Sequence, residues 1–386
     1  MIDRQRHMRS VGPQQIKRIK RFWQKLDWAR KDMERAINGS TAFDMGKWMQ
    51  VHLRSVDPRL DWTAERGYQG GYRMSLGCGP HQHLRPILRA MIDTAPSLPS
   101  WSFTTWREPY ELGDGLGRVR SLTGFDPSRV TVRVERGRHH RFNLTYFIPD
   151  PASRPAAQWK LILHLLTETL LGEDMVEIWI GEIGHAEIHH GRYRSIRLDQ
   201  FIDEMERQAA MLARTLPDEP PHRLADKLPW QEYKLDPRGN ASSFPEKTDM
   251  TWCRTVVPDL LESWLAGDRV YSERFTAFDE SYVYLKCRFD SPAQQSGFRD
   301  RLNMRLARDR LGGMVGEGKG LAYGYLDYAL SDVSAAVPVI REVAARMGLA
   351  KRSWLLFYDA DLRAEWVPLH PDAPRPPLVR SQMVAA

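Results

Sequence analysis

The densest apolar pattern of the chain runs from Leu161 to Ile188, and its period changes once along the way. Up to Leu171, apolar residues recur three or four positions apart, which predicts one face of a helix. Gly172 ends that helix. From Asp174 to Glu182 apolar and polar residues alternate, which predicts a strand. A helix that leads into a strand through a short glycine junction is typical of a fold in which the helix packs across a sheet.

The same two periods predict the elements on the N-terminal side of this stretch. A basic amphipathic helix begins near Pro13 and ends at Ile37, and a shorter helix follows before Pro58. After these come a strand, a helix and three strands, at residues 72–76, 83–94, 101–106, 130–135 and 142–148. Together with the helix and strand described above, this order is close to a ferredoxin-like βαββαβ sandwich with one added strand.

A second set of alternating helices and strands is predicted in the C-terminal half. After a helix at 257–265, the patterns predict β, α, β, α and β at residues 282–289, 293–311, 321–330, 334–347 and 354–358. We therefore expect an α+β protein. It would contain two ferredoxin-like α/β sandwich domains, each with a mainly antiparallel sheet and helices on one face, preceded by a helical segment.

Stretches rich in Pro, Gly and Asp indicate where these parts are joined. The predicted parts are a basic N-terminal helical segment, a first sandwich, a linker, a second sandwich and an extended Pro-rich tail, at residues 1–58, 59–216, 217–250, 251–367 and 368–386. The linker follows a helix predicted at 198–216. The tail carries four prolines between residues 371 and 377, so we expect it to be extended.

Composition and charge narrow the class of protein. The apolar content of 42% and the charged content of 27% are those of a soluble globular protein. No stretch approaches the roughly 18 apolar residues of a membrane span. Three scattered cysteines favour a reducing cytoplasm over a disulfide framework. The net charge of +7 is spread along the chain, so an acidic partner protein is favoured over nucleic acid, which stays open.

The segment from Phe22 to Ile183 resembles the uncharacterised bacterial domain family DUF695. The resemblance is carried by Phe22-Trp23 at the opening of a helix, by RMSLGCG with HLRPILRAMIDTAPSLPSWSFTTWREP, and by LLTETLLGEDMVEIWIGEI. Family positions for Ala-Pro, Trp, Arg-Pro and Leu-Gly-Glu are occupied here by Ala95, Pro96, Trp101, Arg107, Pro109, Leu171, Gly172 and Glu173, with Glu108 inserted between Arg107 and Pro109. The resemblance implies a fold for less than half of the chain and no activity, cofactor or catalytic residue.

One stretch has the residues of a nucleotide-binding motif but not the secondary structure that the motif requires around it. Residues Gly313 to Lys319 satisfy G-x-x-x-x-G-K. A phosphate-binding loop needs a strand before it, a helix after it, and Ser or Thr after the Lys. Here a helix comes before, a strand is predicted after, and Gly320 follows the Lys. We therefore interpret the stretch as a helix-to-strand loop that is able to touch a partner.

A histidine cluster is the chemistry that best supports an enzyme. His185, Glu187 and His189 would point the same way in a strand, and this geometry could seat a zinc ion. Exposed polar residues at a strand end are the simpler interpretation. If the cluster binds zinc, the protein would be a metal-assisted hydrolase acting on a phosphate-bearing substrate. If these residues are only exposed polar side chains, we expect no metal and no cofactor.

Aromatic residues give a further signal. The chain has 13 Trp, and such residues are typical both of interaction surfaces and of thick sandwich cores. The candidate binding residues are aromatic or basic side chains in predicted strands and loops: Trp101, Trp106, Arg107, Lys319, Tyr323 and Tyr325.

Because no motif meets its own structural requirements, the sequence favours a non-enzymatic protein-binding module. An immunity or defence-associated protein of a bacterial system is one form of this function. The metal-assisted hydrolase is the alternative. Oligomeric state and partner identity are not encoded in any pattern we recognise.

Overall fold

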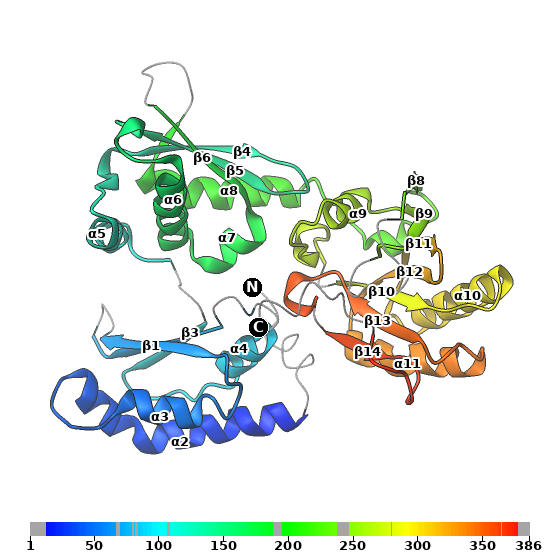
Figure 1. The fold of residues 1–386 in the computed structure, drawn as a ribbon, viewed down its shortest axis with the longest axis horizontal. Coiled ribbons are helices and arrows are strands. Elements are labelled where there is room, and N and C mark those ends of the chain that lie inside the picture. Colours follow the sequence, from blue (N-terminus) through cyan, green and yellow to red (C-terminus); the bar gives the residue numbers. More distant parts are fainter. Residues whose placement is uncertain are drawn as a thin grey trace. The chain divides into compact units, whose positions relative to one another are not determined.

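A computed structural model describes residues 13–66, 70–78, 81, 84–105, 109–187, 195–237, 247–278, 280–363 and 365–376. Within these residues the protein is an α+β protein, as predicted (Figure 1). The chain forms two compact units, Met1–Met211 and Leu212–Ala386, which are described separately.

The first unit contains two small mixed sheets with helices packed on them. Its elements are α2 (Pro13–Ile37), α3 (Met45–His52), β1 (Asp61–Arg66), β2 (Tyr72–Gly77), α4 (Arg85–Asp93), β3 (Trp101–Thr105), α5 (Leu112–Thr123), β4 (Thr131–Arg136), β5 (Phe142–Ile148), α6 (Ala156–Leu171), α7 (Glu173–Trp179), β6 (Ile180–Glu187), β7 (Ile196–Arg197) and α8 (Phe201–Ala213). The last of these continues two residues past the division between the units. The predicted bounds of α2 are confirmed.

Both sheets of the first unit repeat one connection. An antiparallel hairpin, β1-β2 or β4-β5, is followed by a helical crossover to a parallel strand, β3 or β6. The strand orders are β1-β2-β3 and β6-β5-β4-β7. The strands predicted for a single sandwich therefore lie in two sheets. Local sequence pattern identifies strands but not their partners, because pairing depends on contacts between distant residues.

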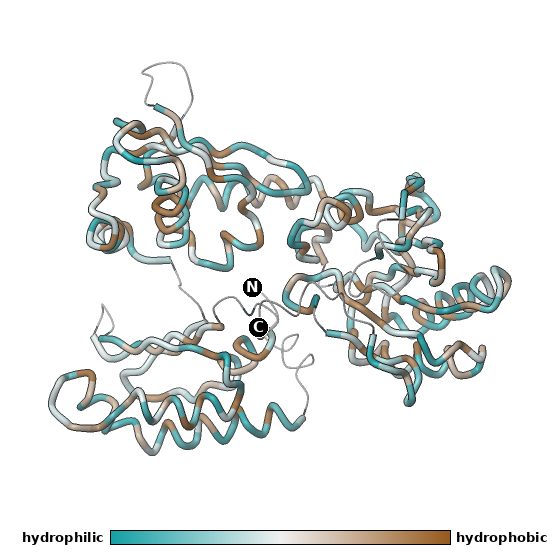
Figure 2. Tube along the Cα trace, in the orientation of Figure 1, coloured by the Kyte–Doolittle hydropathy of each residue, from teal (hydrophilic) through white to brown (hydrophobic). Residues whose placement is uncertain are grey.

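Helix α2 belongs to the core of the first unit. Its buried residues follow the helical period along one side: Ile19, Phe22, Trp23, Leu26 and Met33. Figure 2 shows the matching alternation of hydrophilic and hydrophobic positions along this helix. These side chains pack with buried residues of α3, β2 and α4, among them Met49, Met74 and Leu88.

The strand predicted from Asp174 to Glu182 is wrong in its first part. Residues Glu173–Trp179 form the short helix α7, and the strand β6 begins at Ile180. Gly172 has a φ of +79°, so the chain turns there and immediately enters a new helix. The acidic Glu173 and Asp174 stabilise the first turn of that helix. Over seven residues, an alternating pattern does not separate a helix from a strand.

The second unit is built on one seven-stranded antiparallel sheet. Its elements are β8 (Gln231–Lys234), β9 (Met250–Thr255), α9 (Pro258–Leu265), β10 (Ser281–Cys287), α10 (Pro292–Arg308), β11 (Gly312–Gly320), β12 (Gly324–Leu330), α11 (Val333–Arg346), β13 (Ser353–Phe357) and β14 (Trp366–Pro368). The strand order is β14-β13-β10-β12-β11-β9-β8. The four middle strands with α10 and α11 have the order and connections of a ferredoxin-like βαββαβ fold, and the other three strands extend this sheet.

Each face of the seven-stranded sheet has its own core. Along β10, Val283 and Leu285 join the cluster that includes buried residues of α10 and α11, while Tyr282 and Tyr284 join the cluster that includes α9. Successive side chains of a strand point to opposite faces, so these two clusters lie on opposite sides of the sheet. Helices therefore cover both faces, whereas the sequence predicted helices on one.

Parts of the predicted linker and tail are ordered in the second unit. The linker contains strand β8, and Trp230 and Tyr233 pack against the core on the α9 side. In the tail, Leu369 is buried and the Pro374 carbonyl accepts a hydrogen bond from Trp354 Nε1 at 2.8 Å. Both segments gain these contacts from residues far away in the chain, which composition alone does not indicate.

Candidate functional site

The glycine-rich stretch that resembles a phosphate-binding loop is strand β11, in the middle of the sheet. Its prediction as a loop is wrong. A β-carbon on Gly316 would lie 2.7 Å from Asp327 Oδ2, and one on Gly320 would overlap the carboxylate of Asp249. The glycines are therefore required because neighbouring strands place buried carboxylates against β11. No strand precedes it and no helix follows it in the way that phosphate binding requires.

A buried lysine occupies the α9 side of the sheet beside β11. Lys247 Nζ donates hydrogen bonds to Asp327 Oδ1 at 2.6 Å and to the Tyr358 hydroxyl at 2.5 Å. It also lies 4.5 Å from the ring centroid of Tyr284, and its side chain is 1% exposed. An ammonium group held by one carboxylate and aromatic faces is a stable buried ion pair. This group has no exposed surface, so we interpret it as structural.

The neighbouring carboxylate fixes the turn between β11 and β12. Asp249 is fully buried, and it accepts hydrogen bonds from the backbone N–H groups of Ala322 and Tyr323 and from the Tyr325 hydroxyl. Burial, followed by the nearby Asp249 charge, raises the pKa of Tyr325 well above its ordinary value. The turn that follows Gly-Lys-Gly at the end of β11 is thus held by a carboxylate of the protein itself.

Buried thiols make the stability of the second unit depend on pH. Burial raises the pKa of Cys253 and of Cys287 to about 12, from an ordinary value of 9.0. A raised pKa in the folded state stabilises the protein fully below pH 9, and this contribution is lost as the pH rises from 9 towards 12. We expect the free energy of unfolding to fall by about 1 kcal/mol per thiol between pH 9 and pH 10.

Urea unfolding at pH 8, 9 and 10 measures this effect, and a midpoint that does not move would contradict it. Buried Tyr282, Tyr328 and Tyr358, whose pKa values burial also raises, act in the same direction above pH 10. The double variant Cys253→Ser with Cys287→Ser separates the contributions of these thiols and of the tyrosines, because its free energy of unfolding begins to fall only where tyrosine ionises.

The face of β11 that points towards α10 carries a different set of side chains. The register pairs Glu317 with Arg254 and Arg254 with Glu232 across β11, β9 and β8. The next row on the same face consists of Lys319, Trp252 and Lys234. Directly paired residues project on the same side of a sheet. We call these six residues the wing face, and Trp230, which packs against the core on the α9 side, borders it at the edge of the sheet.

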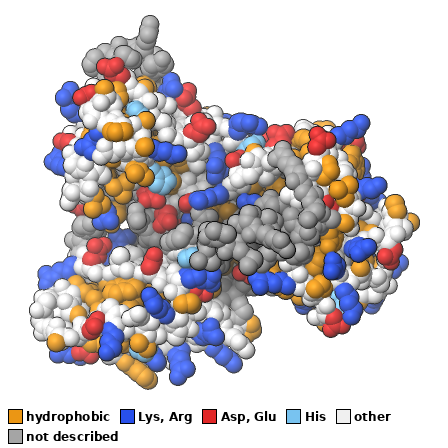
Figure 3. Space-filling model, viewed as in Figure 1, with side chains coloured by type: hydrophobic (Ala, Val, Ile, Leu, Met, Phe, Trp, Pro, Cys, Tyr) orange, Lys and Arg blue, Asp and Glu red, His pale blue; other side chains and the backbone are white. Residues whose placement is uncertain are grey.

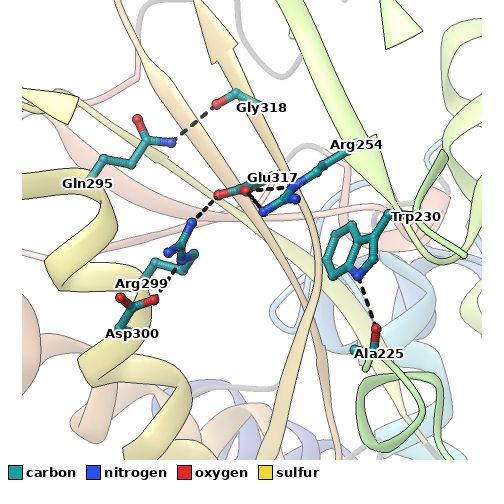
Figure 4. A network of polar contacts seen from close by, with 8 residues as sticks. All are labelled: Ala225, Trp230, Arg254, Gln295, Arg299, Asp300, Glu317 and Gly318. Carbon is teal, nitrogen blue, oxygen red and sulfur yellow. Dashed lines mark hydrogen bonds and ion pairs between the residues drawn. The ribbon is translucent and has the colours of Figure 1, made fainter. Parts of the chain in front are cut away.

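The first row of the wing face is tied to helix α10 by charge (Figure 4). Arg254 Nε donates to Glu317 Oε1 at 2.7 Å, and Arg299 of α10 donates to Glu317 Oε2 at 3.1 Å. The guanidinium of Arg254 also lies 4.8 Å from the ring centroid of Trp230. Two arginines share the buried Glu317 carboxylate, and Arg299 also pairs with Asp300 at 2.8 Å, so the charges of this cluster balance.

The second row of the wing face is open to solvent. Lys319 and Lys234 are exposed, and Trp252 between them is only partly buried. Within the part of the chain that the structure describes, neither lysine forms an ion pair. An indole flanked by two unpaired ammonium groups is a surface suited to an acidic partner that also brings an apolar side chain.

The structure separates the residues that the sequence singled out as binding candidates. Lys319 lies on the wing face, whereas Tyr323 and Tyr325 lie in the core on the α9 side, with 6% and 0% exposure. Trp101 is buried in the first unit, where its Nε1 donates to Glu34 Oε1 at 2.9 Å. These three aromatic side chains offer no surface to a partner. Trp106 and Arg107 lie outside the described residues.

The candidate metal ligands are only partly described. His185 and Glu187 occupy alternate positions of β6, and the imidazole of His185 lies 6.1 Å from the ring of Trp159. His189 lies outside the described residues. Among the residues that are described, no three His, Cys, Asp or Glu side chains are grouped so that they could hold a metal ion.

Most of the wing face was missed at the level of the sequence. Residues 231–234 and 250–255 were assigned to a linker or left unassigned, and Glu317 was placed in a loop. The local signal is weak in both strands, because Gln231–Lys234 has Tyr233 as its one apolar residue and Met250–Thr255 alternates only over its first three positions. The pairing of Trp252 with Lys319 joins residues more than sixty positions apart.

Comparisons of the chain with protein-family models, with curated proteins and with solved structures found no match. Among the described residues, no helix is both long enough and apolar enough to cross a bilayer.

Proposed function

We propose that this protein is a non-enzymatic protein-binding module, and that the wing face of its second unit binds an acidic partner protein. The observation that carries the proposal is the row Lys234, Trp252 and Lys319, in which an aromatic side chain lies between two exposed ammonium groups on a rigid sheet. Tryptophan and arginine are the residues that most often dominate binding energy at interfaces.

The setting of the wing face supports a binding role. Arg254 and Glu317 are held in place by hydrogen bonds from two directions, so the surface is organised before a partner arrives. A preorganised surface loses little side-chain entropy on association. The unpaired Lys234 and Lys319 would steer an acidic partner and determine its orientation, because charges at the rim act mainly on association and specificity.

An immunity or defence-associated role in a bacterial system would be one case of this function, with an acidic toxin or effector as the partner. The metal-assisted hydrolase through His185, Glu187 and His189 remains the alternative proposal. Its third ligand, His189, lies outside the described residues, and we favour binding because of the exposed row on the wing face.

Charge reversal on the open row tests the proposal. We expect the double variant Lys234→Glu with Lys319→Glu to weaken partner binding at least about tenfold, which corresponds to about 1.4 kcal/mol. Lysates of the native host would be passed over the immobilised wild-type chain and over this variant, and the captured protein would then be titrated against both. Lys160→Glu, at an exposed site on α6, is the matched control.

The expected result is one acidic protein captured by wild type and by Lys160→Glu but depleted by the double variant. Surface substitutions of this kind change the free energy of unfolding by only about 0.5 kcal/mol, so loss of fold would not explain depletion. If all three chains captured the same proteins with equal affinity, the wing face would not be the binding site.

A further inference from the structure

The outer side of helix α2 presents a tryptophan to solvent. Trp28 is 83% exposed, the largest value among the exposed large hydrophobic residues of the described chain. It points away from the buried stripe of the same helix. With about 3.6 residues per turn, Lys17, Arg21, Trp28 and Arg35 lie along one line on that outer side. A tryptophan this exposed contributes nothing to the core, and the charges around it decide whether it is a binding residue.

Unpaired positive charge surrounds this tryptophan on its N-terminal side. Residues 13–26 contain Lys17, Arg18, Lys20, Arg21 and Lys25 and no Asp or Glu. Of these, all but Lys25 are exposed, and Lys31 on the next turn is exposed as well. Within the described residues, none of the five exposed side chains forms an ion pair. Figure 3 shows blue side chains along the lower edge of the first unit, where α2 lies.

The neighbouring helix α3 extends the same basic surface. Trp48 of α3 packs on Phe22 of α2 with ring centroids 6.1 Å apart, and Lys25 Nζ lies 3.3 Å from His52 Nδ1. Beyond these contacts, α3 and the turn that follows it expose Lys47 and Arg54. Helix α2 has no acidic residue in its first turn. Cations there oppose the helix dipole, so their placement is not explained by stability of the helix.

A basic surface of this kind could bind an anionic membrane or a nucleic acid, and the distribution of apolar residues decides between the two. A helix that lies on a membrane needs a free apolar face to insert between the lipids. In α2 that face is formed by Ile19, Phe22, Trp23, Leu26 and Met33, and it is buried in the core of the unit. What stays exposed is one indole with unpaired cations on its N-terminal side, while the acidic Asp27 and Asp32 near it are paired with Arg30 and Arg35. This is the arrangement used for single strands, in which the cations follow the phosphates and an unpaired base stacks on the aromatic ring.

We propose that the outer face of α2 binds single-stranded nucleic acid, with Trp28 stacking on a base and with Lys17, Arg21 and Lys31 contacting phosphates. This site is distinct from the wing face, and it does not depend on the protein-binding function. A duplex would offer phosphates but no unpaired base to Trp28.

Fluorescence anisotropy of labelled 20-nucleotide probes tests this proposal on the full chain. The probes are an oligo-U, an oligo-dT and a mixed-sequence duplex. We expect the single strands to bind more tightly than the duplex, with affinity that falls as salt increases from 50 to 200 mM. The two single strands distinguish RNA from DNA as the ligand, and a preference for either one supports the site.

Two variants and two controls assign the binding to α2. Trp28→Ala is expected to weaken single-strand binding about tenfold and Trp28→Phe much less, because phenylalanine still stacks. Lys17→Glu with Arg21→Glu is expected to weaken it at least about tenfold and to reduce its salt dependence. Lys160→Glu and Leu122→Ala, at exposed sites on α6 and α5, are expected to bind as wild type does.

Three results would overturn the proposal. One is equal binding of duplex and single strands with no effect of Trp28→Ala, which would mean contact with phosphates alone. Another is the absence of binding to any probe at 50 mM salt. The third is binding to vesicles that contain phosphatidylglycerol, with a blue shift of tryptophan fluorescence that Trp28→Ala removes, while the oligonucleotides are not bound. The circular dichroism spectrum and melting temperature of each variant confirm that the fold is retained.

Discussion

Replacing Asp327 with alanine is expected to lower the free energy of unfolding of the second unit by about 3–5 kcal/mol. The substitution leaves the ammonium group of Lys247 in the core without its carboxylate. The side chain of Lys247 is 1% exposed, so water cannot solvate it in place of Asp327. Urea unfolding of the full chain measures this loss. Hydrogen exchange of peptides from β10 and β12 reports the free energy of unfolding of the second unit in particular.

Two further variants separate the buried ion pair from ordinary surface charge. Asp300→Ala removes a carboxylate that is 64% exposed and pairs with Arg299, and it should cost about 1 kcal/mol or less. The double variant Lys247→Met with Asp327→Leu should be more stable than Asp327→Ala alone, because it leaves no uncompensated charge. A loss of under about 1 kcal/mol for Asp327→Ala would mean that Lys247 is solvated or neutral in the folded protein.

Gly312→Ala is expected to destabilise the second unit by about 3 kcal/mol or more. Gly312 has a φ of +128°, and a β-carbon there would overlap the Ala329 carbonyl and lie 2.9 Å from Leu330 Cα. Both neighbours are backbone atoms of β12, so no side-chain rearrangement can relieve the clash. Melting of the variant followed by circular dichroism reports the loss.

Gly348→Ala is the matched control for this effect. Gly348 also has a positive φ, +61°, but no atom lies within 4 Å of a β-carbon built on it. Its substitution should cost only the strain of the left-handed backbone, about 1–2 kcal/mol. Equal losses for the two variants would show that the close approach of β11 and β12 is not rigid.

The sequence predicts the parts of this fold whose signal is local. Helix α2 was predicted with its observed bounds, because its apolar residues keep one period over 25 positions. Strand β5 was likewise predicted over Phe142–Ile148. In the second unit, the strands β10, β12 and β13 and the helices α10 and α11 were predicted in their observed order. Strand β11 was mistaken for a loop, so the predicted order lacked one strand of the βαββαβ fold.

The features that were missed depend on contacts between distant residues. In the sequence alone, the glycines of β11 are typical of a loop. The structure shows why they occur in a strand, because Asp327 and Asp249 lie against Gly316 and Gly320. Trp252 gained its two flanking lysines through strand pairing, which no local window contains. Lys319 was chosen as a binding candidate on a stretch interpreted as a loop, and it is instead an exposed residue of strand β11 on the wing face.

The central claim is that the wing face binds a partner protein in the cell. A photo-activated crosslinking amino acid placed at Lys319 in the native host tests it directly, with the same substitution at Lys160 as the comparison. We predict one major crosslinked adduct to an acidic protein from position 319 and none to that protein from position 160. Identical adduct patterns from the two positions, or no adduct from position 319, would contradict the claim.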